Sequence, residues 1–303
     1  MHDGNAALFE AEMTLPDARL SSLSERLVGF RARYERIHQA LHILVDRDGL
    51  EQWCKKHYGK RLPLVDSLLD RYPLVIFHGD VGTGKTATAE AAANALAKEL
   101  RKDAMLFKLS TRVRGSGNVG EMSTLINRAF DVVAKEAGKS RLSFLIIDEA
   151  DSLAASRSTH QSHHEDKVAV NTLIQKIDDI RRFSGRVLVI LCTNRYEALD
   201  PAILRRAAHQ EEFRRPDDVE RREILQLDCD GLDLPTPLLD ELVTLTGPRG
   251  PHKLGYTFSD LRTRLIPETL AQAYPARKVE PEDFRSALKR VAPSPSVSER
   301  GGH

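Results

Sequence analysis

The feature that most constrains the fold is a glycine-rich stretch in the first third of the chain. A short apolar run at residues 74–78 precedes it, and an alanine-rich segment with helical spacing follows at 87–100. A glycine loop between a strand and a helix directs backbone N–H groups and the positive helix end toward phosphate oxygens. We therefore expect Lys85 to reach the outer phosphates of a nucleotide and Thr86 to hold Mg²⁺. The stretch matches the pattern G-x-x-x-x-G-K-[ST] and reads Gly79-Asp80-Val81-Gly82-Thr83-Gly84-Lys85-Thr86.

A second segment ends in acidic side chains about sixty residues further on. Residues 143–147 are predicted to form a strand whose apolar character suits a parallel sheet covered on both faces. Asp148 and Glu149 follow directly. We expect Asp148 beside the metal ion and Glu149 where it can activate an attacking water. Together the two segments predict ATP and Mg²⁺ as ligands and ATP hydrolysis as the reaction.

Two further polar positions fit the same chemistry. Asn194 follows a predicted strand at 186–193, where its amide could align the attacking water. Arg205 and Arg206 end a short predicted helix, and either could reach a nucleotide held by a neighbouring subunit. Arginines supplied in this way contribute about 10³–10⁵ in rate. The alternatives are an asparagine that merely ends a strand and a solvated basic helix end.

Strands and helices alternate as far as residue 216, which is typical of a doubly wound α/β domain. Only helical patterns follow. The ends of the chain look different, because residues 1–16 read as an irregular tail and the last residues are rich in Ser, Pro and Gly. We predict an N-terminal helical segment at 1–70, a large α/β ATPase domain at 71–216, a helical lid at 217–291 and a disordered tail at 292–303.

Charge and composition exclude several classes of function. The 303 residues carry 45 Lys and Arg against 44 Asp and Glu, so the net charge does not favour nucleic acid as a partner. No apolar run approaches the ~20 residues that a membrane span needs. The acidic start lacks the apolar core of a signal peptide, and the three cysteines are scattered. These features predict a cytoplasmic protein without a membrane partner.

The ordered set of motifs resembles the AAA+ ATPases over roughly residues 74–291. The resemblance implies a P-loop fold with a parallel five-stranded sheet and a small all-helical lid. It also implies a homo-hexamer that binds ATP between subunits. By resemblance, Asp148 coordinates Mg²⁺, Glu149 is the catalytic base, Asn194 is the first sensor, and Arg205 or Arg206 is the arginine finger.

Within that class, residues 106–130 and 170–182 are similar to the pachytene-checkpoint ATPases, which remodel HORMA-domain proteins. Bacterial relatives of this group act in anti-phage (CBASS-type) signalling systems, beside a nucleotidyltransferase and a HORMA protein. The resemblance therefore implies a hexamer that spends ATP to remodel or disassemble a HORMA-domain partner, with a nucleotidyltransferase nearby.

Two segments depart from the family pattern. The loop that normally grips a threaded peptide with an aromatic residue carries Val113, Arg114 and Gly115 instead, so a limited pull on one terminus is expected rather than processive threading. The second departure lies at the start of a helix in the lid. Pachytene-checkpoint relatives have a sensor arginine where Ser259 falls, and Arg262 or Arg264 is the expected substitute.

Two other classes of function stay open at this point. One is a nucleic-acid motor or loader, which the near-neutral charge and the lack of an aromatic and basic strip disfavour. The other is a scaffold that uses ATP as a switch and hydrolyses it poorly. Glu149 and the arginine pair disfavour that reading, because both serve hydrolysis.

Overall fold

The structure is a computed structural model that describes residues 8–109, 121–138, 140–154, 164–248 and 252–296. The chain divides into two compact units. The sheet unit comprises the described parts of residues 1–24, 30–78 and 86–212. The helical unit comprises those of residues 25–29, 79–85 and 213–303.

A six-stranded mixed sheet organises the sheet unit, in the order β1-β3-β4-β5-β2-β6. The pairs β3–β4, β4–β5 and β2–β5 are parallel, and β1 pairs with β3 in the antiparallel direction. The mostly parallel sheet confirms the predicted α/β fold class. The strands are β1 (Phe9–Leu15), β2 (Leu74–Gly79), β3 (Ala104–Leu109), β4 (Leu142–Ile147), β5 (Val187–Thr193) and β6 (His209–Phe213).

Strand β1 corrects the prediction of an irregular N-terminal tail and of a sheet with five parallel strands. It covers the free edge of β3, and the ring of Phe9 packs 5.0 Å from that of Phe107. Only its two end residues, Phe9 and Leu15, are buried. A period-two signal was nevertheless present, because Phe9, Ala11, Met13 and Leu15 alternate with polar residues.

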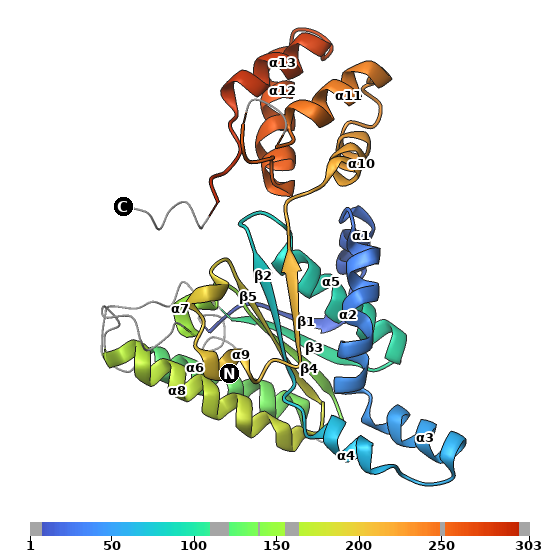
Figure 1. Cartoon of the computed structure of the whole chain (residues 1–303), viewed down its shortest axis with the longest axis vertical. Coiled ribbons are helices and arrows are strands. Elements are labelled where there is room, and N and C mark those ends of the chain that lie inside the picture. Colours follow the sequence, from blue (N-terminus) through green and yellow to red (C-terminus); the bar gives the residue numbers. More distant parts are fainter. Residues whose placement is uncertain (1–7, 110–120, 139, 155–163, 249–251, 297–303) are drawn as a thin grey trace. The chain divides into compact units, whose positions relative to one another are not determined.

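Helices cover both faces of the sheet. Helices α6 and α8 lie side by side over one face, whereas α2 and α5 lie over the other (Figure 1). Among the described residues, none of the helices combines the length and apolar character needed to cross a membrane. The helices up to α9 are α1 (Ala18–Arg26), α2 (Phe30–Val45), α3 (Arg47–Tyr58), α4 (Pro63–Leu69), α5 (Lys85–Leu100), α6 (Glu121–Ala137), α7 (Asp151–Ala154), α8 (His164–Asp179) and α9 (Pro201–Leu204).

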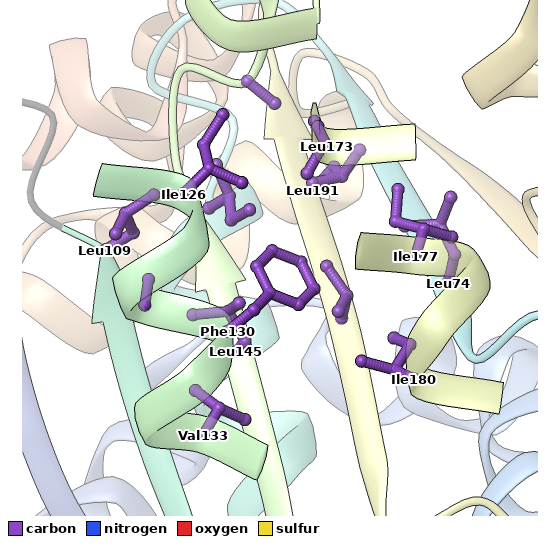
Figure 2. Packing of buried hydrophobic residues seen from close by; sticks show 14 of the residues in the cluster. Leu74, Leu109, Ile126, Phe130, Val133, Leu145, Leu173, Ile177, Ile180 and Leu191 are labelled. Carbon is purple, nitrogen blue, oxygen red and sulfur yellow. The ribbon is translucent and has the colours of Figure 1, made fainter. Parts of the chain in front are cut away.

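The main core lies between the sheet and the pair α6 and α8. Phe130 of α6 sits against Leu145 of β4, and Ile177 of α8 belongs to the same buried cluster (Figure 2). Every residue of β4 and of β5 is buried, as expected for central strands with helices on both faces. Each fully buried Leu, Ile or Phe contributes about 1.5–3 kcal/mol, so these strands give the site a rigid base.

The helical unit contains α10 (Asp218–Asp228), α11 (Thr236–Leu245), α12 (Ile266–Ala273) and α13 (Pro281–Arg290). A wide helical turn, Asp260–Leu265, leads into α12. Helix α10 begins with a capping box, in which Asp217 and Glu220 satisfy each other's backbone N–H groups. Two small apolar clusters hold the helices together. The C-terminal helices agree with the all-helical part of the expected fold, whereas the bounds 217–291 and the role as a lid stay predictions.

The segment after α13 differs from the predicted disordered tail. The structure describes residues 292–296, and Ser294 is anchored by its backbone N–H, 2.9 Å from Oδ2 of Asp260. Its hydroxyl lies 2.6 Å from Oδ1 of the same carboxylate. Hydrogen bonds therefore order a segment whose composition offers little to bury. Residues 297–303 lie outside the described part.

Candidate active site

Strand order places side by side the strands that precede the predicted catalytic segments. Strand β5 lies between β4 and β2, and the parallel pairs align Ile147 with Leu191 and His78 with Thr193. The carboxyl ends of the three strands are therefore neighbours. Ligands of open α/β sheets bind at these ends, and the acidic pair, Asn194 and the glycine loop each follow one of them.

The glycine loop has a backbone that other residues fit poorly. Gly79 has a φ of 139°, and a Cβ there would lie 2.0 Å from the carbonyl oxygen of Phe213. Gly82 has a φ of 74°, and its Cβ would lie 2.8 Å from the Cβ of Ser259 and from Oγ1 of Thr257. Positive φ and close neighbours both require glycine, which explains these two positions of the motif.

The loop is closed by its own side chains and leads into a helix start. The Lys85 ammonium donates to the carbonyl oxygens of Gly79 and Asp80, at 3.0 and 2.7 Å. The hydroxyl of Thr83 also donates to Asp80 O, at 2.8 Å. Helix α5 begins at Lys85, so the positive end of its dipole adds to the lysine charge. Binding of phosphate by this loop stays a prediction.

Thr86 and Asp148, the residues predicted to hold Mg²⁺, lie within hydrogen-bonding distance of each other. The Thr86 hydroxyl lies 2.7 Å from Oδ2 of Asp148, and Oδ1 of that carboxylate accepts the backbone N–H of Glu149 at 2.9 Å. Mg²⁺ prefers oxygen ligands and is usually held by one or two side chains together with phosphates and waters. A hydroxyl and a carboxylate oxygen this close fit such an ion.

Glu149 occupies a strained backbone position. Its φ is 47°, and its side chain is exposed. A residue other than glycine costs of order 1–3 kcal/mol in such a conformation, and strain of this kind gathers at functional sites. The next residue is fixed, because the N–H of Ala150 donates to Cys192 O at 2.9 Å. The backbone therefore holds Glu149 in place while its carboxylate faces solvent.

A side-chain bridge joins the ends of β4 and β5 beside Asn194. The Thr193 hydroxyl donates to Oδ1 of Asp151 at 2.8 Å and accepts the N–H of Arg195 at 3.0 Å. Asn194 is half-buried and lies between Thr193 and Arg195 in the sequence. Sequence analysis assigned no role to Asp151, although its place in the acidic run was a signal. Its hydrogen bond to Thr193 fixes the residue that precedes Asn194.

The two neighbouring arginines have different surroundings. Arg206 pairs with Asp178 through two hydrogen bonds of 2.7 and 3.0 Å, and its guanidinium lies 5.3 Å from the ring centre of Tyr72. These hydrogen bonds raise the pKa of Arg206 further. Arg205 is exposed at the end of α9. The structure therefore commits Arg206 to its own subunit and leaves Arg205 facing outward.

The proposed second sensor is engaged within the helical unit. The guanidinium of Arg262 binds both oxygens of Asp228, at 2.6 and 3.2 Å. Arg264 donates to Asp260 at 2.9 Å and to Ala292 O at 3.0 Å. A role for Arg262 at the nucleotide stays a prediction, and it requires this ion pair to open. The predicted peptide-gripping residues Val113, Arg114 and Gly115 lie outside the described residues.

Two contacts to the glycine loop were not predicted from the sequence. The N–H of Ser259 donates to Gly82 O at 3.1 Å, and Nε of Arg215 donates to Oδ2 of Asp80 at 2.8 Å. Arg215 lies outside the predicted motifs, and Ser259 was noted only as the position where relatives carry a sensor arginine. The loop is thus held by side chains and backbone far from it in the sequence.

Known proteins similar to this chain were found at the level of both sequence and structure. Residues 75–215 match the ATPase family associated with various cellular activities (AAA). CD-NTase-associated protein 6 of Escherichia coli (strain KTE188) is 49% identical over 295 residues, which cover 97% of this chain and 99% of that protein.

Two solved structures are also similar over nearly the whole chain. A chain in the structure of the E. coli MS115-1 HORMA:CdnC:Trip13 complex has a TM-score of 0.88 at 40% identity, covering 96% of this chain and 98% of that one. Rhizobiales Trip13 has a TM-score of 0.72 at 34% identity, covering 95% and 100%. Because the similarity extends over the sheet, the acidic strand end and the helical unit, the chain belongs to the AAA family of ATPases, as a Trip13-like member.

Proposed function

We propose that this ATPase remodels a HORMA-domain protein and acts with a nucleotidyltransferase in a bacterial defence system. The observation that carries the proposal is the match to a chain from a HORMA:CdnC:Trip13 complex, at a TM-score of 0.88 over 96% of this chain. Similarity over this much of the chain supports the proposal that the two proteins act on partners of the same kind. We also predict that the protein acts in the cytoplasm, which cell fractionation would test.

In the proposed reaction, the amides of the glycine loop and Lys85 bind the phosphates of ATP. Thr86 and Asp148 would hold Mg²⁺, which supplies positive charge against the charge that develops on the phosphates. Glu149 accepts a proton from the attacking water, and Asn194 aligns that water. The short distance between Thr86 and Asp148, 2.7 Å, supports the metal-holding pair.

We further propose that the protein works as a homo-hexamer in which Arg205 completes the site of a neighbouring subunit. Arg205 is exposed, whereas Arg206 is held by Asp178 and lies over Tyr72. An arginine already paired on both sides is a poor donor to a second molecule, because its own contacts must break first. This difference favours Arg205 as the arginine finger.

The work on the partner is proposed to come from closure of the helical unit over ATP. Closing motions of this kind are common in ATP-driven enzymes. Val113 and Arg114 would transmit the motion to a terminal segment of the partner. The absence of an aromatic residue in this loop supports a short pull rather than processive threading.

The proposal is tested by ATP turnover with and without a HORMA protein. The probes are the HORMA protein of the E. coli MS115-1 complex and a HORMA protein from this chain's own genome. We expect the partner to stimulate turnover, and Glu149→Gln to lower kcat by about 10²–10⁴ while trapping an ATP-bound complex with the partner.

The matched control is Glu223→Gln, which changes an exposed glutamate of α10. It should turn over ATP at the wild-type rate and should trap no complex. ATP turnover that neither HORMA protein stimulates would contradict the proposed partner. It would not contradict the assignment as an ATPase. Stimulation by DNA instead would favour a nucleic-acid motor.

A further inference from the structure

The glycine loop carries an acidic residue at its second position, where a polyanion must bind. An unpaired carboxylate there would repel the phosphates, because like charges at short range oppose each other strongly. In this chain Asp80 is paired, since Nε of Arg215 lies 2.8 Å from its Oδ2. Both side chains are largely buried, with 22% of Asp80 and 13% of Arg215 exposed.

The same guanidinium is held by two other segments of the helical unit. Nη1 of Arg215 donates to the carbonyl oxygen of Gly255 at 2.6 Å, and Nη2 donates to that of Ser294 at 2.8 Å. A guanidinium is planar, so three fixed acceptors set its orientation. The Arg215 guanidinium thus binds Asp80 and the segment after α13 at the same time.

Ser294 has its own anchor, independent of Arg215. Its N–H and its hydroxyl both bind the carboxylate of Asp260, which is only 1% exposed. The N–H of Thr257 binds the same group at 3.0 Å. Burial alone would raise the pKa of Asp260, but the hydrogen bonds from Ser294 and Thr257 outweigh it and lower the pKa. The acid is therefore held charged beneath the segment.

The local sequence favours this arrangement. Pro293 and Pro295 flank Ser294, and a residue before proline is restricted to extended conformations. Both Ala292 and Ser294 precede a proline. A segment restricted in this way loses less conformational entropy when it is held, so a few hydrogen bonds suffice to fix it without an apolar anchor.

We propose that Arg215 is a positioning residue of the nucleotide site, and that it couples ATP affinity to the seating of the C-terminal segment 292–294. When the segment is seated, the carbonyl of Ser294 orients Arg215 toward Asp80 and the loop presents no free negative charge. When the segment is displaced, Arg215 loses an acceptor and Asp80 opposes phosphate binding. The inference rests on residues 79–86 being the nucleotide-binding loop.

The first test measures the affinity for a fluorescent ATP analogue, mant-ATP, together with KM and kcat. Arg215→Ala should weaken binding by about tenfold, as expected for loss of a charge-assisted hydrogen bond. Asp80→Ala added to Arg215→Ala should restore much of that affinity, because the acid that Arg215 no longer offsets is gone. A double variant that binds as weakly as Arg215→Ala, or more weakly, would overturn the proposal.

The second test removes the C-terminal segment. A chain that ends at Ala292 should bind mant-ATP more weakly than the full chain, with a raised KM and a kcat that changes little. A chain that ends at Ser296 keeps Ser294 and is the matched control, so it should bind as the full chain does. In the Arg215→Ala background both truncations should bind equally, since the coupling is already lost.

Equal binding by the two truncations in the wild-type background would overturn the coupling. The coupling would also be overturned if the chain that ends at Ala292 still bound mant-ATP more weakly in the Arg215→Ala background. Thermal unfolding of each variant separates misfolding from altered affinity. Lys85→Ala tests the loop itself: if that variant still binds mant-ATP normally, the assignment of the nucleotide loop fails, whatever the truncations show.

Discussion

Two buried or half-buried aspartates, one in each unit, show how the same residue type serves different ends. Asp148 of the sheet unit accepts hydrogen bonds from the Thr86 hydroxyl and the Glu149 amide. Asp260 of the helical unit accepts from Thr257, from both the N–H and hydroxyl of Ser294, and from Arg264. A carboxylate has about four acceptor positions, so Asp260 is saturated and Asp148 is not.

The arginines repeat this contrast. Arg205 is exposed at the end of α9. Arg221 of α10 is 2% exposed and is bound to the carbonyls of Val243 and Pro216 and to Asp218. Spare hydrogen-bonding capacity at an accessible place marks a group that can act on a ligand. Saturated capacity in the interior marks a group that holds the fold. Substitution of an accessible group should therefore lower activity, whereas substitution of a saturated, buried group should lower stability.

The largest effect is expected at the exposed arginine. Arg205→Ala should lower the kcat of the assembled protein by about 10³, within the range measured for arginines supplied by a neighbour. Thermal unfolding should be unchanged, because in the described part of the structure the side chain is exposed. Steady-state ATP turnover and calorimetry on the same samples check both halves of this prediction.

Mixing subunits provides the sharpest control for Arg205. Arg205→Ala lacks the finger but keeps Glu149, whereas Glu149→Gln lacks the base but keeps the finger. If the arginine acts across subunits, mixed assemblies contain some complete sites and regain turnover that neither variant shows alone. Mixtures that stay inactive would contradict action across the subunit interface.

The next effect is a loss of stability at the buried arginine. Arg221→Ala should destabilise the helical unit by about 3 kcal/mol, because it leaves buried carbonyls and Asp218 without their donor. Arg222→Ala is the matched control, since its side chain is 37% exposed and its ion pair with Asp240 is on the surface. Urea unfolding followed by circular dichroism measures the stability of both variants. Equal unfolding midpoints for Arg221→Ala and Arg222→Ala would contradict the structural role assigned to Arg221.

Motifs of adjacent residues and contacts between distant residues differ in how far the sequence predicts them. The glycine loop and the acidic strand end were predictable because the chemistry of phosphate and Mg²⁺ binding requires particular residues at adjacent positions. The order of the strands then places the ends of β4 and β5, which Asp148 and Asn194 follow, beside each other. Residues that must be adjacent for their chemistry form a motif that can be recognised in the sequence.

The contacts of the helical unit leave no such pattern. Arg215 and Asp80 are 135 positions apart, and Ser294 and Asp260 are 34 apart. The composition of the last residues indicated disorder, whereas hydrogen bonds to a buried acid hold part of them. Strand β1 is an edge strand whose partner is almost a hundred residues away, so its alternating pattern did not by itself show that it joins the sheet.

A smaller effect is expected at Arg206, which tests whether saturation predicts a structural role inside the sheet unit too. Arg206→Ala should lower the Tm by about 2–4 °C, as expected for roughly 1 kcal/mol in a domain of this size. The kcat should fall only a few-fold, through looser placement of α9. A thousandfold loss of kcat without a change in Tm would identify Arg206 as the arginine finger. It would also contradict the view that groups with saturated hydrogen bonds serve the fold.

The smallest effect is a pH dependence at the start of α13. Hydrogen bonds from the Arg277 guanidinium, and then from the N–H of Glu280, lower the pKa of Asp283 from 3.8 to about 2. Because the folded pKa lies below the unfolded one, the contribution to stability is complete above the unfolded pKa and is lost as the pH falls toward 2. Arg277 is 43% exposed, so solvent screens the pair and the effect is modest.

Asp283→Asn tests this prediction through the Tm measured between roughly pH 3 and 7. The variant should be less stable than the wild type near neutrality, and the difference should shrink toward the acidic end. Asp230→Asn changes an exposed acid of the same unit and should follow the wild type throughout. A constant difference between Asp283→Asn and the wild type would mean that the charge of Asp283 contributes nothing. The contrast drawn from Asp148 and Asp260 would then not extend to Asp283.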